Sequence, residues 1–213
     1  MFRPGFVSTA SRPRTCLRTS SDSGFSLIEI VTVAFVLVTL AALVIIPIRN
    51  MTGYYRLSGD ARAVSNTVAV AKLRAASLFT QTRVYASLGS GTYQIQKWQK
   101  TGTPGWVTEG EIIALSPGVV FGFGAVSTPP PATQAAIAQA SACNDDAGVA
   151  IPGTACVLFN SRGLPVDASG APTAIGAYYL TDGVSVYAAT ISATGMIRFW
   201  RTPAGASPQW ALQ

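Results

Sequence analysis

One stretch of the sequence limits what this chain can fold into more than any other. Residues 25–48 read FSLIEIVTVAFVLVTLAALVIIPI and carry a single charge, on Glu29. As an α-helix this stretch would span about 36 Å at ~1.5 Å per residue, which exceeds the bilayer core of about 30 Å. It therefore predicts a transmembrane helix over residues 25–48.

The main alternative is a cleaved secretory signal peptide. Such a peptide has an apolar core of about 7–15 residues that ends at a small-residue cleavage site. Here the uncharged run from Ile30 to Ile48 is nineteen residues long and is followed by Arg49. Its length and its ending favour a retained anchor over a signal peptide.

Composition and charge exclude several classes of function. The 213 residues include no histidine, so a Ser-His-Asp or Cys-His catalytic set and a histidine-ligated zinc or haem are excluded. The net charge is +6, but residues 84–213 hold five basic and six acidic side chains. DNA binding requires a basic surface that neutralises several phosphates, and this part of the sequence does not show one.

A membrane-anchored hydrolase is the remaining enzyme class. Without histidine it would need a Ser-Lys dyad, and the lysines are Lys72, Lys97 and Lys100. No nearby serine forms a recognisable motif with any of them. We therefore predict no catalytic residue, no cofactor and no metal site.

The three cysteines bear on the compartment. Cys16 precedes the apolar stretch, which leaves Cys143 and Cys156, separated by twelve residues, as the only downstream pair. A disulfide between them would contribute ~3 kcal/mol and would require an oxidising compartment; two unpaired buried thiols are the alternative. A disulfide favours a cytoplasmic N-terminus and a periplasmic C-terminal domain in a bacterial inner membrane.

Helical periodicity resumes beyond the apolar stretch. Pro47 and Gly53 are expected to interrupt or kink the helix, and residues 49–81 read as an amphipathic periplasmic helix, so that one long helix covers roughly residues 25–80. An apolar stripe along this helix predicts that the helix packs on a sheet, and an autonomous coiled coil is the alternative. Its basic face is interpreted as solvated or attracted to anionic headgroups. The stripe consists of Leu57, Ala61, Val64, Val68, Ala71, Ala75 and Leu78.

Residues 82–213 are predicted to form a β-rich globular domain, which makes the fold class α+β: a long helix packed on an antiparallel sheet. Asp182-Gly183 is a strong hairpin signal. Residues 125–153 interrupt the strands as a long loop, in which an Ala/Gln stretch has the composition of a short helix. Asn144-Asp145-Asp146 suggests a solvated acidic turn rather than a calcium loop. The predicted strands are 83–86, 93–98, 111–115, 119–123, 177–180, 184–191 and 196–200.

The start of the apolar stretch resembles the processing signal of type IV pilins and type II secretion pseudopilins. Gly24 follows a basic leader, Phe25 opens the apolar run and Glu29 lies four residues later. The resemblance implies that a prepilin peptidase removes residues 1–24 and N-methylates Phe25. It also implies that Glu29 pairs with the N-terminal amine of a neighbouring subunit, although the carboxylate could instead reach the headgroups.

The globular part is similar to the FimT/GspH group of minor pilins and pseudopilins, in Lys72-Leu73-Arg74-Ala75 and in a turn through Arg162-Gly163 that follows a central strand in that group. A GspH-like subunit implies a periplasmic pseudopilus for protein secretion, with other pseudopilins or pilins, an inner-membrane assembly platform and the lipid bilayer as partners. A FimT-like minor pilin, which takes part in pilus assembly or DNA uptake, is the alternative. In that case DNA would contact Arg198 and Arg201, where the family's glycine-arginine motif is only partly kept.

Overall fold

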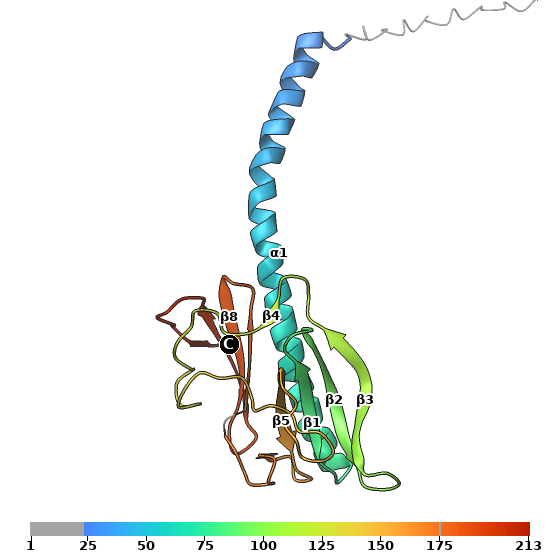
Figure 1. The fold of residues 1–213 in the computed structure, drawn as a ribbon. Helices are drawn as coiled ribbons and strands as arrows, with labels where there is room; N and C mark the ends of the chain where they lie inside the picture. Colours follow the sequence, from blue (N-terminus) through green and yellow to red (C-terminus); the bar gives the residue numbers. More distant parts are fainter. Residues whose placement is uncertain (1–23, 175) are drawn as a thin grey trace, which may run out of the picture. The chain divides into compact units, whose positions relative to one another are not determined.

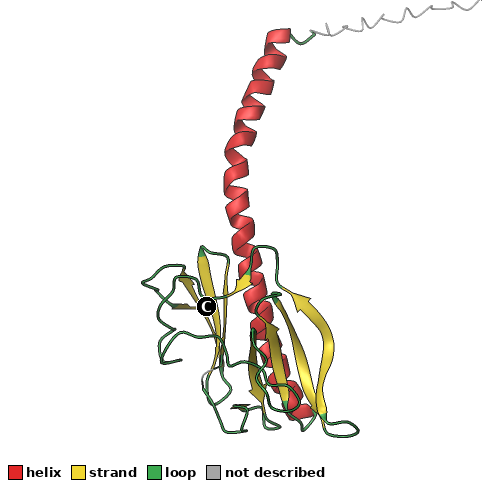
Figure 2. Cartoon of the chain, viewed as in Figure 1, coloured by secondary structure: helices red, strands yellow, loops and turns green. Residues whose placement is uncertain are grey.

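The structure, a computed structural model, describes residues 24–174 and 176–213, and leaves out the side chains of residues 43–51. The predicted leader therefore lies, except for Gly24, outside the described residues. The chain divides into two compact units, residues 1–45 and 46–213. Regular structure in the described residues consists of one helix followed by ten strands. Figure 2 colours the helix red and the strands yellow.

Helix α1 runs from Leu27 to Ser77, which confirms one long helix at this end of the chain. Pro47 and Gly53 are both helical, so neither interrupts it. Six members of the predicted stripe are fully buried, but the seventh, Leu78, is 41% exposed. Leu78 lies beyond the last helical residue, where the periodicity that buries the others no longer holds. The six buried residues are Leu57, Ala61, Val64, Val68, Ala71 and Ala75.

The C-terminal end of α1 has an unusual residue in its cap. The amide of Thr80 donates to the carbonyl of Ala75 at 3.3 Å, the bond of a Schellman cap, whose C′ position requires a left-handed backbone and favours glycine. Here Phe79 occupies that position with a φ of 49°. Its ring is 75% exposed, so the strained backbone is not offset by burial of the side chain.

Replacing Phe79 with glycine should therefore stabilise the chain. We expect the free energy of unfolding to rise by about 1 kcal/mol, since a left-handed conformation costs a non-glycine residue ~1–2 kcal/mol and glycine loses more entropy on folding. Chemical denaturation measures this change. The control is Phe79→Ala, which removes the same ring but keeps the Cβ, and a gain of equal size in that variant would contradict the explanation.

The first five-stranded sheet has the order β3-β2-β1-β5-β6 and is antiparallel throughout. Strands β1 and β2 match predicted strands, whereas β3 starts six residues earlier than predicted. Strand β5 lies between β1 and β6, directly before the turn through Arg162-Gly163. The strands are β1 Thr82–Ser87, β2 Thr92–Gln99, β3 Gly105–Ala114, β5 Thr154–Phe159 and β6 Pro165–Val166.

The second five-stranded sheet has the order β10-β9-β8-β7-β4 and is also antiparallel. Asp182-Gly183 forms the predicted β7–β8 hairpin: an Asp182 oxygen accepts from the amides of Val184 and Ser185 at 2.9 and 2.8 Å. Gly183 has a φ of 86°, which a turn of this kind requires of its glycine. The strands are β4 Val120–Phe121, β7 Ala177–Thr181, β8 Ser185–Ile191, β9 Ile197–Pro203 and β10 Ala211–Leu212.

The main core lies where the buried stripe of α1 packs against both sheets (Figure 1). Small residues such as Ala61 and Ala71 let the helix approach the strands closely, and both are fully buried. Tyr178 of β7 joins the two sheets: its hydroxyl donates to the carbonyl of Val84 at 2.7 Å and accepts from the amide of Val157 at 2.9 Å. Burial raises the pKa of Tyr178, so the hydroxyl keeps its donor proton at neutral pH.

The long loop at residues 125–153 is a packed part of the fold. Val126 belongs to a second apolar cluster with Tyr179 and Trp200, on the face of the second sheet that points away from α1. The predicted short Ala/Gln helix is wrong, because no residue of 132–140 is helical. Instead, the Gln139 side chain accepts from the Tyr179 amide and donates to its carbonyl, at 3.0 and 2.8 Å, which holds the segment along β7.

In the part of the chain that the structure describes, no helix contains an apolar stretch of the length and hydropathy needed to cross a membrane. The transmembrane helix predicted over residues 25–48 is thus not found among the described residues. Residues 43–48 of that segment belong to the part whose side chains are left out.

Candidate functional site

The first turn of α1 contains the residues of the predicted processing signal. Ser26 is the N-cap: its carbonyl accepts from the amides of Glu29 and Ile30 at 3.0 and 3.2 Å. Glu29 is thus the third helical residue, where a carboxylate lies close to the positive end of the helix dipole. Gly24 and Phe25 precede the cap, and Phe25 is 79% exposed.

The following four turns expose apolar side chains in every direction. Each described side chain from Leu27 to residue 42 is exposed, and Glu29 is the one charged residue among them. Leu27, Phe35 and Val38 are 80%, 70% and 68% exposed. A helix that is apolar on all sides is normally covered by protein or lipid, and within the described part of its own unit nothing covers this segment.

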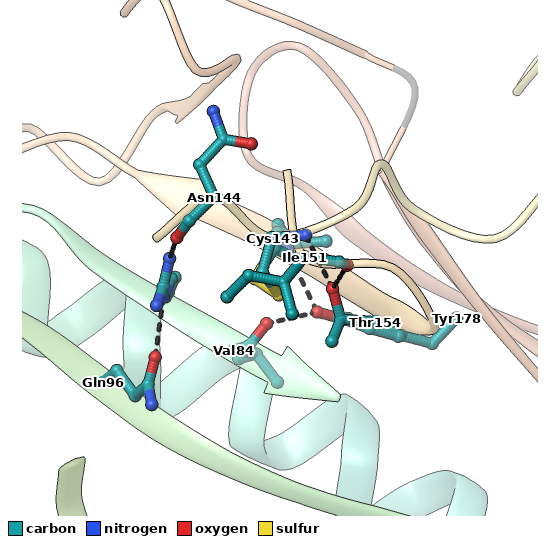
Figure 3. Close-up of a disulfide and its surroundings, with 10 residues drawn as sticks. Val84, Gln96, Cys143, Asn144, Ile151, Thr154 and Tyr178 are labelled. Carbon is teal, nitrogen blue, oxygen red and sulfur yellow. Dashed lines mark hydrogen bonds between the residues drawn. A yellow bond between two sulfur atoms is a disulfide. The ribbon is translucent and has the colours of Figure 1, made fainter. Parts of the chain in front are cut away.

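The predicted disulfide between Cys143 and Cys156 is present, with 4.9 Å between the Cα atoms. Figure 3 shows the hydrogen bonds around it. The Thr154 hydroxyl accepts from the Cys143 amide at 2.9 Å and donates to the Ile151 carbonyl at 2.6 Å. The amide of Ile151 donates to the Cys143 carbonyl at 2.7 Å. The disulfide therefore closes a hairpin that is also held by its backbone.

Arg83 is a buried cation next to this hairpin, and no pattern in the sequence predicts its burial. Its Nε donates to Gln96 at 2.7 Å and a terminal nitrogen donates to the Asn144 carbonyl. The guanidinium also stacks on Trp106, 4.0 Å from the ring centroid. Burial lowers the pKa of Arg83 to about 10, so the group stays charged at neutral pH and ties β1 to the disulfide hairpin.

A cleft of about 670 Å³ lies beside Arg83, bounded by the disulfide hairpin and the turn after β6. Trp98 and Trp106 form one wall, with ring centroids 5.3 Å apart. The two disulfide cysteines are the only predicted site residues that line it.

In the segment Asn144-Asp145-Asp146, both carboxylates accept hydrogen bonds from backbone amides. Asp145 accepts from the amides of Ala147 and Val149 at 2.9 and 2.8 Å, and Asp146 accepts from the amide of Trp106 at 2.8 Å. Among the described residues, no group of three acidic or cysteine side chains could hold a metal ion. These bonds agree with an acidic turn whose carboxylates accept from backbone amides.

Two glycine turns that are far apart in the sequence meet on α1. The Lys72 ammonium donates to the carbonyl of Gly195 at 2.9 Å. A Cβ on Gly163 would lie 3.2 Å from Lys72 Cγ, and one on Gly195 would lie 3.0 Å from the Gly163 carbonyl oxygen. Both glycines are therefore required for close packing, and the Lys72 side chain holds the turn at Gly195 on α1. Their glycine-turn composition was visible in the sequence, but their meeting was not.

The two candidate DNA-contacting residues lie on opposite faces of β9. Residues three apart in a strand point to opposite sides of its sheet. Arg198 is exposed, while Arg201 lies over the rings of Tyr54 and Tyr187, 4.9 and 5.9 Å from their centroids. The strand therefore does not present these two residues as one basic patch.

No protein-family model matches the chain, and no curated protein matches its sequence. Among solved structures, the chain is similar to the minor pseudopilin EpsH from the type 2 secretion system of Vibrio cholerae, with a TM-score of 0.35 and 9% sequence identity. The match covers 74% of this chain and 96% of the EpsH chain. A similarity this low carries no inference about the function of this chain.

Proposed function

We propose that this chain is a minor pseudopilin of a type II secretion system. A prepilin peptidase cleaves it between Gly24 and Phe25, and the mature subunit enters a periplasmic filament from the inner membrane. Residues 25–48 anchor the subunit in the lipid bilayer before assembly, and residues 49–213 form the periplasmic part. The nineteen uncharged residues from Ile30 to Ile48 support the membrane anchor.

One observation carries this proposal. The apolar helix from Leu27 to residue 42 is exposed on all sides, and its one charged residue, Glu29, lies in the first turn directly after Gly24-Phe25. A carboxylate in an apolar helix costs about 2.5–3.5 kcal/mol to insert. Such a residue is rarely kept without a partner, and cleavage at Gly24 would create a cationic amine on Phe25 that can serve as one.

The disulfide supports the periplasmic location. Disulfides persist in oxidising compartments and are rare in the cytosol, and Cys143–Cys156 lies in the part of the chain that follows the anchor.

The FimT-like alternative has less support, because Arg198 and Arg201 lie on opposite faces of β9. Loss of exoprotein secretion in a deletion strain would favour the pseudopilin role, and loss of DNA uptake with intact secretion would favour the alternative.

The processing step is tested by mass spectrometry of the chain isolated from its own membranes. The expected mature chain begins at Phe25, carries one methyl group on its N-terminal amine and lacks residues 1–24. A Gly24→Val variant should retain the leader, because a bulky side chain blocks the residue at which the peptidase cuts. A Gly5→Val variant in the leader is the matched control and should be processed normally. An intact leader on the unaltered chain would refute the proposed function.

A further inference from the structure

Three segments lie together at one end of the second compact unit, residues 46–213, where α1 enters that unit. They are residues 53–56 of α1, the turn 116–118 between β3 and β4, and the β7–β8 turn 182–184, and we call this region the α1-entry end. Together they surround a cavity of about 520 Å³. By chain connectivity, this is the end of the domain that follows directly after the proposed anchor, and the inference below rests on that anchor.

The α1-entry end exposes apolar groups that its own turns do not require. Val184 follows the Asp182-Gly183 hairpin turn and is 75% exposed, although polar residues are the usual choice beside such a turn. Tyr55 is 63% exposed, and it packs edge-to-face against Tyr54. Tyrosines that are apolar at one end and polar at the other concentrate at membrane–water interfaces.

The charged side chains of this end differ in their contacts: the carboxylates bond to neighbouring turns, whereas one guanidinium is exposed. Its carboxylates are held by backbone and hydroxyl groups: Asp60 accepts from the amide and the hydroxyl of Ser116 at 2.7 and 3.0 Å, and Asp182 accepts from the amides of its own turn. Arg56 and Arg201 both line the cavity. Arg56 is exposed, and Arg201 is held in place by its stacking over Tyr54.

We propose that the α1-entry end docks on an anionic lipid surface. Arg56 and Arg201 face the phosphate groups of the lipids, while Val184 and Tyr55 enter the headgroup region. Basic residues next to a membrane anchor are attracted to anionic lipids, and here that attraction acts on a preformed cavity. Docking of this kind holds the periplasmic domain against the bilayer before the subunit enters a filament.

The test uses the full chain reconstituted in vesicles and a tryptophan placed at the surface, Val184→Trp. Brominated phosphatidylglycerol should quench the added fluorescence, because the docked turn lies among the headgroups. Val149→Trp is the matched control, since Val149 is a valine 62% exposed in the disulfide hairpin, and it should not be quenched. Adding Arg56→Gln to Val184→Trp should weaken docking about fivefold, as expected for one arginine near a charged surface.

The possible outcomes separate this inference from the proposed function. If the chain floats with the vesicles but the Val184→Trp signal is no more quenched than the Val149→Trp signal, docking is refuted and the anchor stands. If brominated phosphatidylcholine alone quenches equally, the role of the two arginines is refuted. If the chain does not float with vesicles, the anchor fails, and the docking inference fails with it.

Discussion

Replacing Glu29 with valine is expected to leave the chain in the membrane and to exclude it from the filament. Valine removes the one charge from the apolar stretch 25–48, so insertion becomes easier rather than harder. In the assembled filament, however, the N-terminal amine of Phe25 in a neighbouring subunit would lose its partner. An unpaired charge in an apolar environment costs about 2.5–3.5 kcal/mol, so incorporation should fall roughly a hundredfold.

The structure explains why this residue has no substitute. The ion pair that the structure shows among the described residues joins Arg74 and Glu109, at 3.3 Å, and Glu29 takes part in none there. The carboxylate is therefore available for a partner from another subunit, and no other acidic residue lies between Phe25 and Arg49.

The measurement is the amount of the subunit recovered in filaments that are released from the periplasm by opening the outer membrane, relative to the amount in the inner membrane. Thr32→Val is the matched control: it also places a valine in the exposed helix, one turn further along, and removes only a hydroxyl that donates to the Glu29 carbonyl at 2.9 Å. It should be incorporated normally. Normal incorporation of Glu29→Val would contradict the assigned role, even if the chain is correctly processed.

The sequence predicted α1 and most strands because their signals are local. The stripe from Leu57 to Ala75 repeats with a helical period, and all six of its residues up to Ala75 are fully buried. The hairpin at Asp182-Gly183 is likewise encoded by two adjacent residues. The error at Leu78 has a local cause as well: the helix ends at Ser77, and Phe79 adopts a conformation that its side chain does not favour.

What the sequence could not predict depends on contacts between distant segments. The Ala/Gln stretch has a helical composition, but Gln139 is held along β7 by two bonds to Tyr179, and these outweigh a weak local preference. Strand β5 reads as a continuous apolar run whose period does not separate helix from strand. The link between the two sheets depends on Tyr178 of β7, whose hydroxyl bonds to Val84 and Val157 of the other sheet.

Some features of the candidate site could be predicted from the sequence, and others could not. The disulfide pair followed from counting cysteines, and Glu29 followed from a charge in an apolar helix. The burial of Arg83 and the meeting of Gly163 with Gly195 on Lys72 had no local signal, because each joins residues that are widely separated in the chain. Whether Glu29 acts in assembly stays a prediction.

Removing the disulfide should have the largest effect on stability. The Cys143→Ser, Cys156→Ser double variant is expected to lose about 3 kcal/mol of unfolding free energy, the value for a closed loop of roughly this length. Most of the loss arises in the unfolded chain, which becomes freer. The folded hairpin should persist, since the Thr154 hydroxyl and the Ile151 amide still hold the backbone around position 143.

Denaturation with and without a reducing agent separates this effect from a packing defect. The reducing agent should lower the unfolding free energy of the unaltered chain by about the same ~3 kcal/mol and leave the double variant unchanged. If the serines themselves disturbed the buried site of Cys143, the double variant would instead be less stable than the reduced unaltered chain. A loss below about 0.5 kcal/mol, the range of surface substitutions, would show that the hairpin bonds and the buried Arg83 already hold this region, and would leave the disulfide without its stabilising role.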